Sequence, residues 1–114
     1  MDLQIKEKVY QKYLRLFNSD PEVMVFAPGR VNLIGEHTDY SDGFVFPLAI
    51  NQGIYVAFSP SDDDHLQLYS LDFEEFFEKK ISNFNKEESN WREYIKGIAW
   101  ILRKSGYDLK GFKG

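Results

Sequence analysis

The sequence contains no cysteine, so it cannot form a disulfide scaffold, use a thiolate nucleophile or hold zinc through cysteine ligands. It also lacks a basic surplus, because 14 lysines and arginines stand against 18 acidic residues and leave a formal net charge of −4. This balance argues against a surface that binds nucleic acid or anionic membranes. No apolar run approaches the roughly 20 residues of a membrane-spanning helix, and the first residues lack the hydrophobic core of an export signal, so we expect a cytoplasmic protein.

Large aromatic side chains are abundant, with ten Phe, seven Tyr and two Trp among the 114 residues. They supply enough apolar surface to offset the conformational entropy that a chain of this length loses on folding, on the order of 100–200 kcal/mol. The composition therefore predicts one soluble globular domain and argues against a disordered chain.

Two segments place apolar residues at helical spacing. The first covers residues 3–17 and is expected to end in the polar, proline-containing stretch NSDP that follows. The second covers residues 91–104, with Ser89 or Asn90 as its N-cap and Gly106 at the position that favours a left-handed residue after a helix. The sequence therefore predicts an amphipathic helix on either side of a central region.

Apolar stretches bounded by turn residues predict strands in that central region. They cover residues 23–27, 44–50, 54–59 and 66–70. Pro28 and Gly29 are expected to end the first strand, and residues 51–53 are expected to form a turn between the second and the third. Residues 72–80 fit neither a helical nor a strand period.

The order of helix, strands and helix, without regular alternation of strand and helix, predicts the α+β fold class with a mostly antiparallel or mixed sheet. Residues 109–114 then look like the approach to a further strand. We therefore expect residues 1–114 to be a portion of a larger protein.

Titratable side chains crowd into one non-helical stretch. Arg30, Glu36, His37 and Asp39 lie within ten positions, beside two glycines and a proline, which is typical of a site for a polar ligand. The carboxylates of Glu36 and Asp39 can each accept hydrogen bonds from hydroxyls, and His37 can donate or accept, so the trio suits a sugar or another polyol. Arg30 offers a fixed cation for an anion or a developing negative charge.

Two other interpretations of these residues stay open at this point. They can be ordinary exposed loop residues, with His37 capping a turn and Arg30 paired with a nearby carboxylate. Glu36, His37 and Asp39 can also serve as metal ligands, although three ligands within four residues of an open loop rarely converge on one ion. The stretch matches neither a Walker A loop nor a dinucleotide-binding glycine fingerprint.

Residues 28–40 read PGRVNLIGEHTDY and residues 43–50 read GFVFPLAI. Together they closely resemble the N-terminal signature of galactokinases, a family in the superfamily that also holds homoserine, mevalonate and phosphomevalonate kinases. Residues 91–97 read WREYIKG and resemble the W-x-x-Y-x-K-G helix start of the same family. The resemblance implies that residues 1–114 are the N-terminal portion of a sugar kinase domain, which transfers the γ-phosphoryl group of ATP to the anomeric hydroxyl of galactose and gives galactose 1-phosphate.

The resemblance also implies roles for individual residues. Glu36, His37 and Asp39 match the positions that bind galactose hydroxyls in the family, with Thr38 in the same contact run. Arg30 matches the arginine beside the catalytic aspartate, where it stabilises the transition state. The chain thus carries the expected sugar-binding half-site, with galactose as its substrate.

The nucleotide side of the site is less complete in this sequence. Trp91 and Tyr94 match aromatic residues near the adenine pocket of the family, although both also suit the core face of an amphipathic helix. The family's phosphate loop, resembling G-L-S-S-S-A, does not occur in the sequence. The resemblance implies ATP and magnesium as cofactors and the remainder of the same polypeptide as the partner, so we expect the 114-residue chain alone to be inactive.

Three alternative functions stay open. A kinase for N-acetylgalactosamine shares the signature, but its family members tend to carry an aliphatic residue at the position of Thr38. A galactokinase-like sensor binds galactose and ATP without turnover, and the region of the phosphate loop would distinguish it. A stand-alone carbohydrate-binding domain requires the chain to be complete and folded.

Overall fold

The computed structural model describes residues 2–34, 43–83 and 90–114. In chain order the elements are helix α1 (Leu3–Phe17), strands β1 (Val23–Ile34), β2 (Phe46–Pro60), β3 (His65–Ser70) and β4 (Glu75–Lys80), the 3-10 helix η2 (Ile81–Asn83), helix α2 (Trp91–Lys104) and strand β5 (Phe112–Lys113). The predicted α+β class and both predicted helices are confirmed. Neither α-helix in this described part of the chain is long and apolar enough to cross a membrane.

The strands form one mixed sheet in the order β1-β2-β5-β3-β4. β1 pairs with β2, and β3 pairs with β4, in antiparallel ladders. The short strand β5 lies between these two pairs, antiparallel to β2 and parallel to β3. The expected strand near residues 109–114 is therefore present, and it occupies the centre of the sheet.

Helix α1 begins and ends through local backbone chemistry. The Asp2 side chain accepts hydrogen bonds from the N–H groups of Gln4 and Ile5, and Asn18 ends the helix in the left-handed conformation at φ 53°. The helix is held to the sheet by Tyr13, whose hydroxyl donates to Ser59 Oγ at 2.8 Å.

The first strand prediction was wrong at its end, because β1 continues through Pro28 and Gly29 to Ile34. Proline is tolerated there because β1 is an edge strand and needs fewer backbone donors. The expected turn at residues 51–53 was also wrong, since β2 runs without a break from Phe46 to Pro60.

A β-bulge explains both errors. Pro28 pairs with Gly53, and the next paired residues are Arg30 and Ala49. Only Gly29 lies between these pairs on β1, whereas residues 50–52 lie between them on β2. The turn-like residues are therefore absorbed into an irregularity of a continuous ladder.

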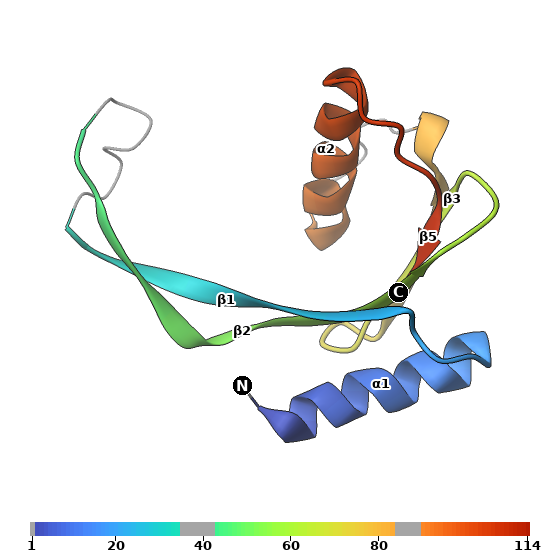
Figure 1. The fold of residues 1–114 in the computed structure, drawn as a ribbon, viewed down its shortest axis with the longest axis horizontal. Coiled ribbons are helices and arrows are strands. Elements are labelled where there is room, and N and C mark those ends of the chain that lie inside the picture. The colour runs from blue at the N-terminus through green and yellow to red at the C-terminus, as the bar shows by residue number, and fades with distance from the viewer. Residues whose placement is uncertain (1, 35–42, 84–89) are drawn as a thin grey trace.

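The hydrophobic core lies between the sheet and helix α2. Leu66, Leu68, Phe77 and Ile81 form its buried cluster, with Trp91, Ile95, Leu109 and Phe112 packed against it. Phe77 comes from β4, so the segment whose period was ambiguous contributes a core residue. Figure 1 shows α1 and α2 on opposite sides of the sheet.

Helix α2 has the predicted start, because the Asn90 side chain accepts a hydrogen bond from Arg92 N–H at 3.0 Å. Gly106 is left-handed at φ 96°, as expected. Part of the apolar stripe of α2 nevertheless faces outward, with Tyr94 79% and Ile98 60% exposed. The ammonium group of Lys96 is buried instead and lies 2.9 Å from Glu93 Oε1.

A matched pair of glycine substitutions tests the close approach of β1 to β2. A Cβ atom at Gly53 would lie 2.3 Å from the Ala27 carbonyl oxygen and 2.8 Å from Pro28 Cα, whereas nothing lies within 4 Å of one at Gly97 in α2. We expect Gly53→Ala to lower the free energy of unfolding by about 1–3 kcal/mol, and Gly97→Ala to raise it by about 0.5–1 kcal/mol. Denaturant titrations measure both; a Gly53→Ala chain as stable as the unchanged protein would contradict this account of the bulge.

Candidate functional site

Arg30 lies in β1 directly after the bulge and pairs with Ala49. Its neighbour Gly29 packs closely against β2, since a Cβ atom there would lie 3.2 Å from the side chain of Ile50. Bulges redirect side chains along a strand, and Arg30 is exposed beyond this one. The guanidinium group is therefore accessible on the two-stranded ribbon formed by β1 and β2.

The part of this ribbon beyond the bulge, residues 29–34 of β1 and 46–50 of β2, is called here the β1–β2 arm and extends away from both helices (Figure 1). Apolar side chains on it are exposed, among them Val31, Leu33, Ile34, Phe46 and Leu48. A two-stranded ribbon is marginally stable by itself in water, so an arm of this kind needs further polypeptide packed on it.

The predicted sugar ligands Glu36, His37, Thr38 and Asp39 lie outside the described residues. The described ends of their segment are Ile34 and Gly43, and Ile34 pairs with Phe46. Within residues 2–34, 43–83 and 90–114, no group of three histidine or carboxylate side chains is arranged to hold a metal ion. The proposed roles of the four residues therefore stay predictions.

Trp91 has a well-defined environment at the start of α2. Its Nε1–H donates to Glu75 Oε2 at 2.9 Å. Its ring is stacked on Phe73, with centroids 6.0 Å apart and planes 5° apart, and it meets Phe77 edge-on at 6.3 Å. Trp91 is thus a packed aromatic at the edge of the core, as the alternative interpretation expected.

Glu75 holds two neighbours at once. The same Oε2 atom that accepts from Trp91 accepts from Arg92 Nη2 at 2.9 Å. The Trp91 hydrogen bond is the largest cause of the lowered pKa of Glu75; desolvation opposes it, and the positive charge and hydrogen bond of Arg92 lower the pKa further. Arg92 also lies 5.9 Å from the ring centroids of Trp91 and Phe77, so the cluster combines an ion pair with cation–π contacts.

Trp91 and Tyr94 also line an apolar groove of about 490 Å³ between the helices and the sheet. Ile5, Val9 and Leu16 of α1 line it from the other side. Arg30 is not among the described residues that line this groove. The structure therefore brings the two predicted nucleotide-site aromatics together and leaves Arg30 on the separate arm.

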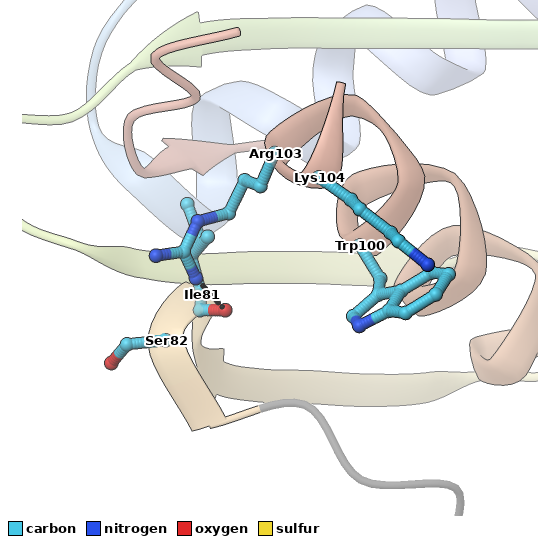
Figure 2. A pocket seen from close by; sticks show the side chains of 5 residues that line it. All are labelled: Ile81, Ser82, Trp100, Arg103 and Lys104. Atoms are coloured by element: carbon cyan, nitrogen blue, oxygen red, sulfur yellow. Dashed lines mark hydrogen bonds between the residues drawn. The ribbon is translucent and has the colours of Figure 1, made fainter. Parts of the chain in front are cut away.

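A second cavity, of about 380 Å³, lies between η2 and the last turn of α2 (Figure 2). Arg103 Nη1 donates to the Ile81 carbonyl at 2.8 Å, and Lys104 Nζ lies 4.8 Å from the centroid of Trp100. Both cations thus have partners within the fold, and basic side chains in a last turn also offset the helix dipole. None of the predicted site residues lines this cavity.

Sequence reasoning missed the residues that position Trp91. Glu75, Phe73 and Phe77 come from the segment 72–80, whose alternation of acidic and aromatic residues matched no single period. Their partnership with Trp91 depends on the β3–β4 hairpin and on the docking of α2, which no local pattern encodes.

The Glu75 cluster generates a pH prediction. Because the folded-state pKa of Glu75 is below its usual 4.5, the charge stabilises the fold above that pH and stops doing so as the pH falls through the lowered pKa. We expect Glu75→Gln to lower Tm at pH 6 and this difference from the unchanged protein to shrink below about pH 4. Melting curves from pH 3 to 7 measure it, with the exposed Glu74→Gln as control. A Glu75→Gln difference that is constant over this range would contradict the role of the charge.

Comparison with known proteins points to one family. Residues 11–60, which contain the second half of α1 and the whole of β1 and β2, match the family described as galactokinase galactose-binding signature. The galactokinase of Staphylococcus carnosus is 46% identical over 102 residues, which cover 86% of this chain and 26% of that protein. The galactokinase of Ligilactobacillus salivarius is 38% identical over 107 residues, which cover 91% of this chain and 28% of that protein.

The fold agrees with these sequence matches. The crystal structure of Lactococcus lactis galactokinase complexed with galactose superposes with a TM-score of 0.80 at 33% identity, covering 96% of this chain and 29% of that one. The chain thus spans between 26% and 29% of the length of these relatives. Over most of its length the chain is therefore similar to galactokinases, and it fits the N-terminal portion of these proteins.

Proposed function

We propose that the chain supplies the sugar-binding half-site of an ATP-dependent galactose kinase that phosphorylates the anomeric hydroxyl. The observation that carries this proposal is the match of residues 11–60 to the galactose-binding signature, because this range contains Arg30 and residues 36–39. The fold match to a galactokinase whose crystal structure contains galactose supports the same assignment.

Each of these residues has a chemical task in the proposal. Glu36 and Asp39 accept hydrogen bonds from sugar hydroxyls, while His37 and Thr38 complete the polar surface. Phosphoryl transfer is catalysed mainly by positioning and by fixed positive charge near the developing negative charge. Arg30, exposed on the β1–β2 arm, supplies such a charge.

The cofactors ATP and magnesium are only partly accommodated by the described residues. These contain no carboxylate set for magnesium. Trp91 already uses its Nε1–H and one ring face on Glu75 and Phe73, which leaves the exposed Tyr94 as the aromatic free to contact a purine. We therefore propose that the remaining ATP contacts and the magnesium ligands belong to other parts of a longer enzyme, working in the cytoplasm.

A chimaera tests the proposed function directly. Residues 1–114 replace the matching portion of Lactococcus lactis galactokinase, and release of ADP is followed with magnesium-ATP, with and without galactose. We expect galactose-dependent ADP release from the chimaera and none from the 114-residue chain alone. A folded chimaera that binds galactose without turnover would contradict the catalytic part of the proposal, and one that does not bind galactose would overturn the sugar assignment.

Within this chimaera, Asp39→Asn keeps the side-chain shape and removes a charged acceptor. A hydrogen bond to a charged group contributes about 1.5–3 kcal/mol, so kcat/KM for galactose should fall at least about tenfold. Asp42→Asn, three positions further along the same segment and outside the predicted sugar ligands, is the matched control and should leave kcat/KM unchanged. Equal kinetics for the two variants would remove Asp39 from the site.

Arg30→Lys separates charge stabilisation from substrate anchoring. Lysine retains the positive charge and loses the planar, forked guanidinium, so a transition-state role predicts that kcat falls about tenfold or more while KM changes little. Steady-state kinetics of the chimaera give both constants. A raised KM with an unchanged kcat would instead make Arg30 an anchor for the substrate.

A further inference from the structure

The indole of Trp91 is fixed in two independent ways at the start of α2. Its stacking on Phe73, with ring planes 5° apart, sets the plane of the ring but still allows the ring to turn within that plane. Its Nε1–H is a donor only, and the hydrogen bond to Glu75 Oε2 at 2.9 Å sets the direction within the plane. Together the two contacts leave the indole a single orientation.

Glu75 is itself held by both segments that it joins. Its backbone pairs with Ser70 in the β3–β4 ladder, and its Oε2 atom also accepts from Arg92 Nη2 at 2.9 Å. The Glu75 and Arg92 side chains are 46% and 34% exposed. Ion pairs this accessible contribute little to folding stability, so the more informative property of the carboxylate is the geometry that it imposes on Trp91.

The turn that carries Phe73 and Glu75 has an unusual backbone. Glu74, which lies between them, has φ 52°, in the left-handed region that residues other than glycine seldom adopt. Ser70 Oγ accepts a hydrogen bond from the Phe73 N–H at 3.3 Å and holds the start of the turn. Such conformations persist where the surrounding contacts impose them, and they concentrate at functional sites. Here both neighbours of the left-handed residue contact Trp91, so the turn and the indole form one unit.

The stacked pair faces the apolar groove next to Tyr94. Phe73, Trp91 and Tyr94 all line this groove. Trp91 covers one face of the Phe73 ring, while Phe73 is still 59% exposed, so its other face is accessible. Tyr94 follows Trp91 by three residues in α2, on the same side of the helix, and is also exposed. Two accessible aromatic surfaces at one end of an apolar groove suit a planar ring.

We propose that Phe73 contacts the purine base of ATP together with Tyr94, and that Glu75 is a positioning residue that acts on Phe73 through Trp91. The inference rests on the proposed kinase function and deepens it, because it names a contact of the base and the residue that orients this contact. Trp91 then supports the ring of Phe73 from behind, and Tyr94 meets the base from the side of α2.

Variants of Glu75 in the chimaera with Lactococcus lactis galactokinase test the positioning role. Glu75→Leu removes the acceptor for Trp91 Nε1–H, whereas Glu75→Gln retains an acceptor and loses the charge. We expect Glu75→Leu to raise the Kd and KM for ATP at least about fivefold with kcat and KM for galactose little changed, and Glu75→Gln to raise them less than about twofold. Titration calorimetry gives the Kd, and steady-state kinetics give the other constants. Glu78→Leu, the same substitution at an exposed position of β4, is the matched control.

A second set of variants tests the route through Trp91. Trp91→Phe removes the N–H group and retains an aromatic ring, so Glu75→Leu should have no further effect on the Kd for ATP in a Trp91→Phe background. Phe73→Ala and Tyr94→Ala should each raise this Kd at least about fivefold. Phe76→Ala, at another exposed phenylalanine of the same hairpin, is the control and should leave it unchanged.

Three outcomes would overturn the proposal. If Glu75→Gln weakens ATP binding as much as Glu75→Leu, the charge of Glu75 and not the orientation of Trp91 controls binding. If Glu75→Leu causes an additional loss in the Trp91→Phe background, Glu75 acts by another route. If Phe73→Ala leaves ATP binding unchanged, the base lies elsewhere.

The failure of the inference is distinguishable from that of the proposed function. The Kd for ATP is measured without galactose, so a chimaera that binds ATP but does not phosphorylate galactose contradicts the proposed function and still yields this test. A folded chimaera that does not bind ATP would refute both. If Glu75→Leu prevents folding, Trp91→Phe replaces it, because it breaks the same hydrogen bond from the other side; an unchanged Kd for ATP would then refute the positioning role.

Discussion

Backbone pairing along β2 is the constraint on which the rest of the structure depends. β2 pairs with the edge strand β1 on one side and with the central strand β5 on the other. Its residue Ser59 accepts hydrogen bonds from Tyr13 of α1 and from Glu22 N–H, both at 2.8 Å. One strand therefore sets the position of α1, of the arm that carries Arg30, and of the centre of the sheet.

Periodic patterns in the sequence predicted the elements whose formation depends on local chemistry, namely the two helices. Both helices have the predicted bounds, because capping by Asp2 and Asn90 and the spacing of apolar residues act within a few positions. The bulge between β1 and β2 could not be predicted, since Pro28, Gly29 and residues 51–53 are turn formers in isolation. They stay in strands only because the two long strands pair beyond them on both sides.

The residues of the candidate site also differ in how far the sequence predicts them. The sugar-binding residues were predicted from one contiguous motif, and residues 36–39 of this motif lie outside the described parts of the chain. Trp91 and Tyr94 came from a shorter motif, and the structure gives them different surroundings: Trp91 is fixed by Glu75 and Phe73, whereas Tyr94 is exposed. The contacts of Trp91 join segments more than ten residues apart in the chain, which a local pattern does not reveal.

The position of β5 has a consequence for the order in which the molecule assembles during synthesis. The strand at the centre of the sheet is the last of the five to leave the ribosome, after both of its neighbours. Tyr13 likewise has to wait for Ser59, which is made 46 residues later. Pairings so distant in sequence form slowly and leave strand borders open in the nascent chain, so translation passes through a stage at which the two halves of the sheet are unjoined and exposed to association with chaperones or other copies.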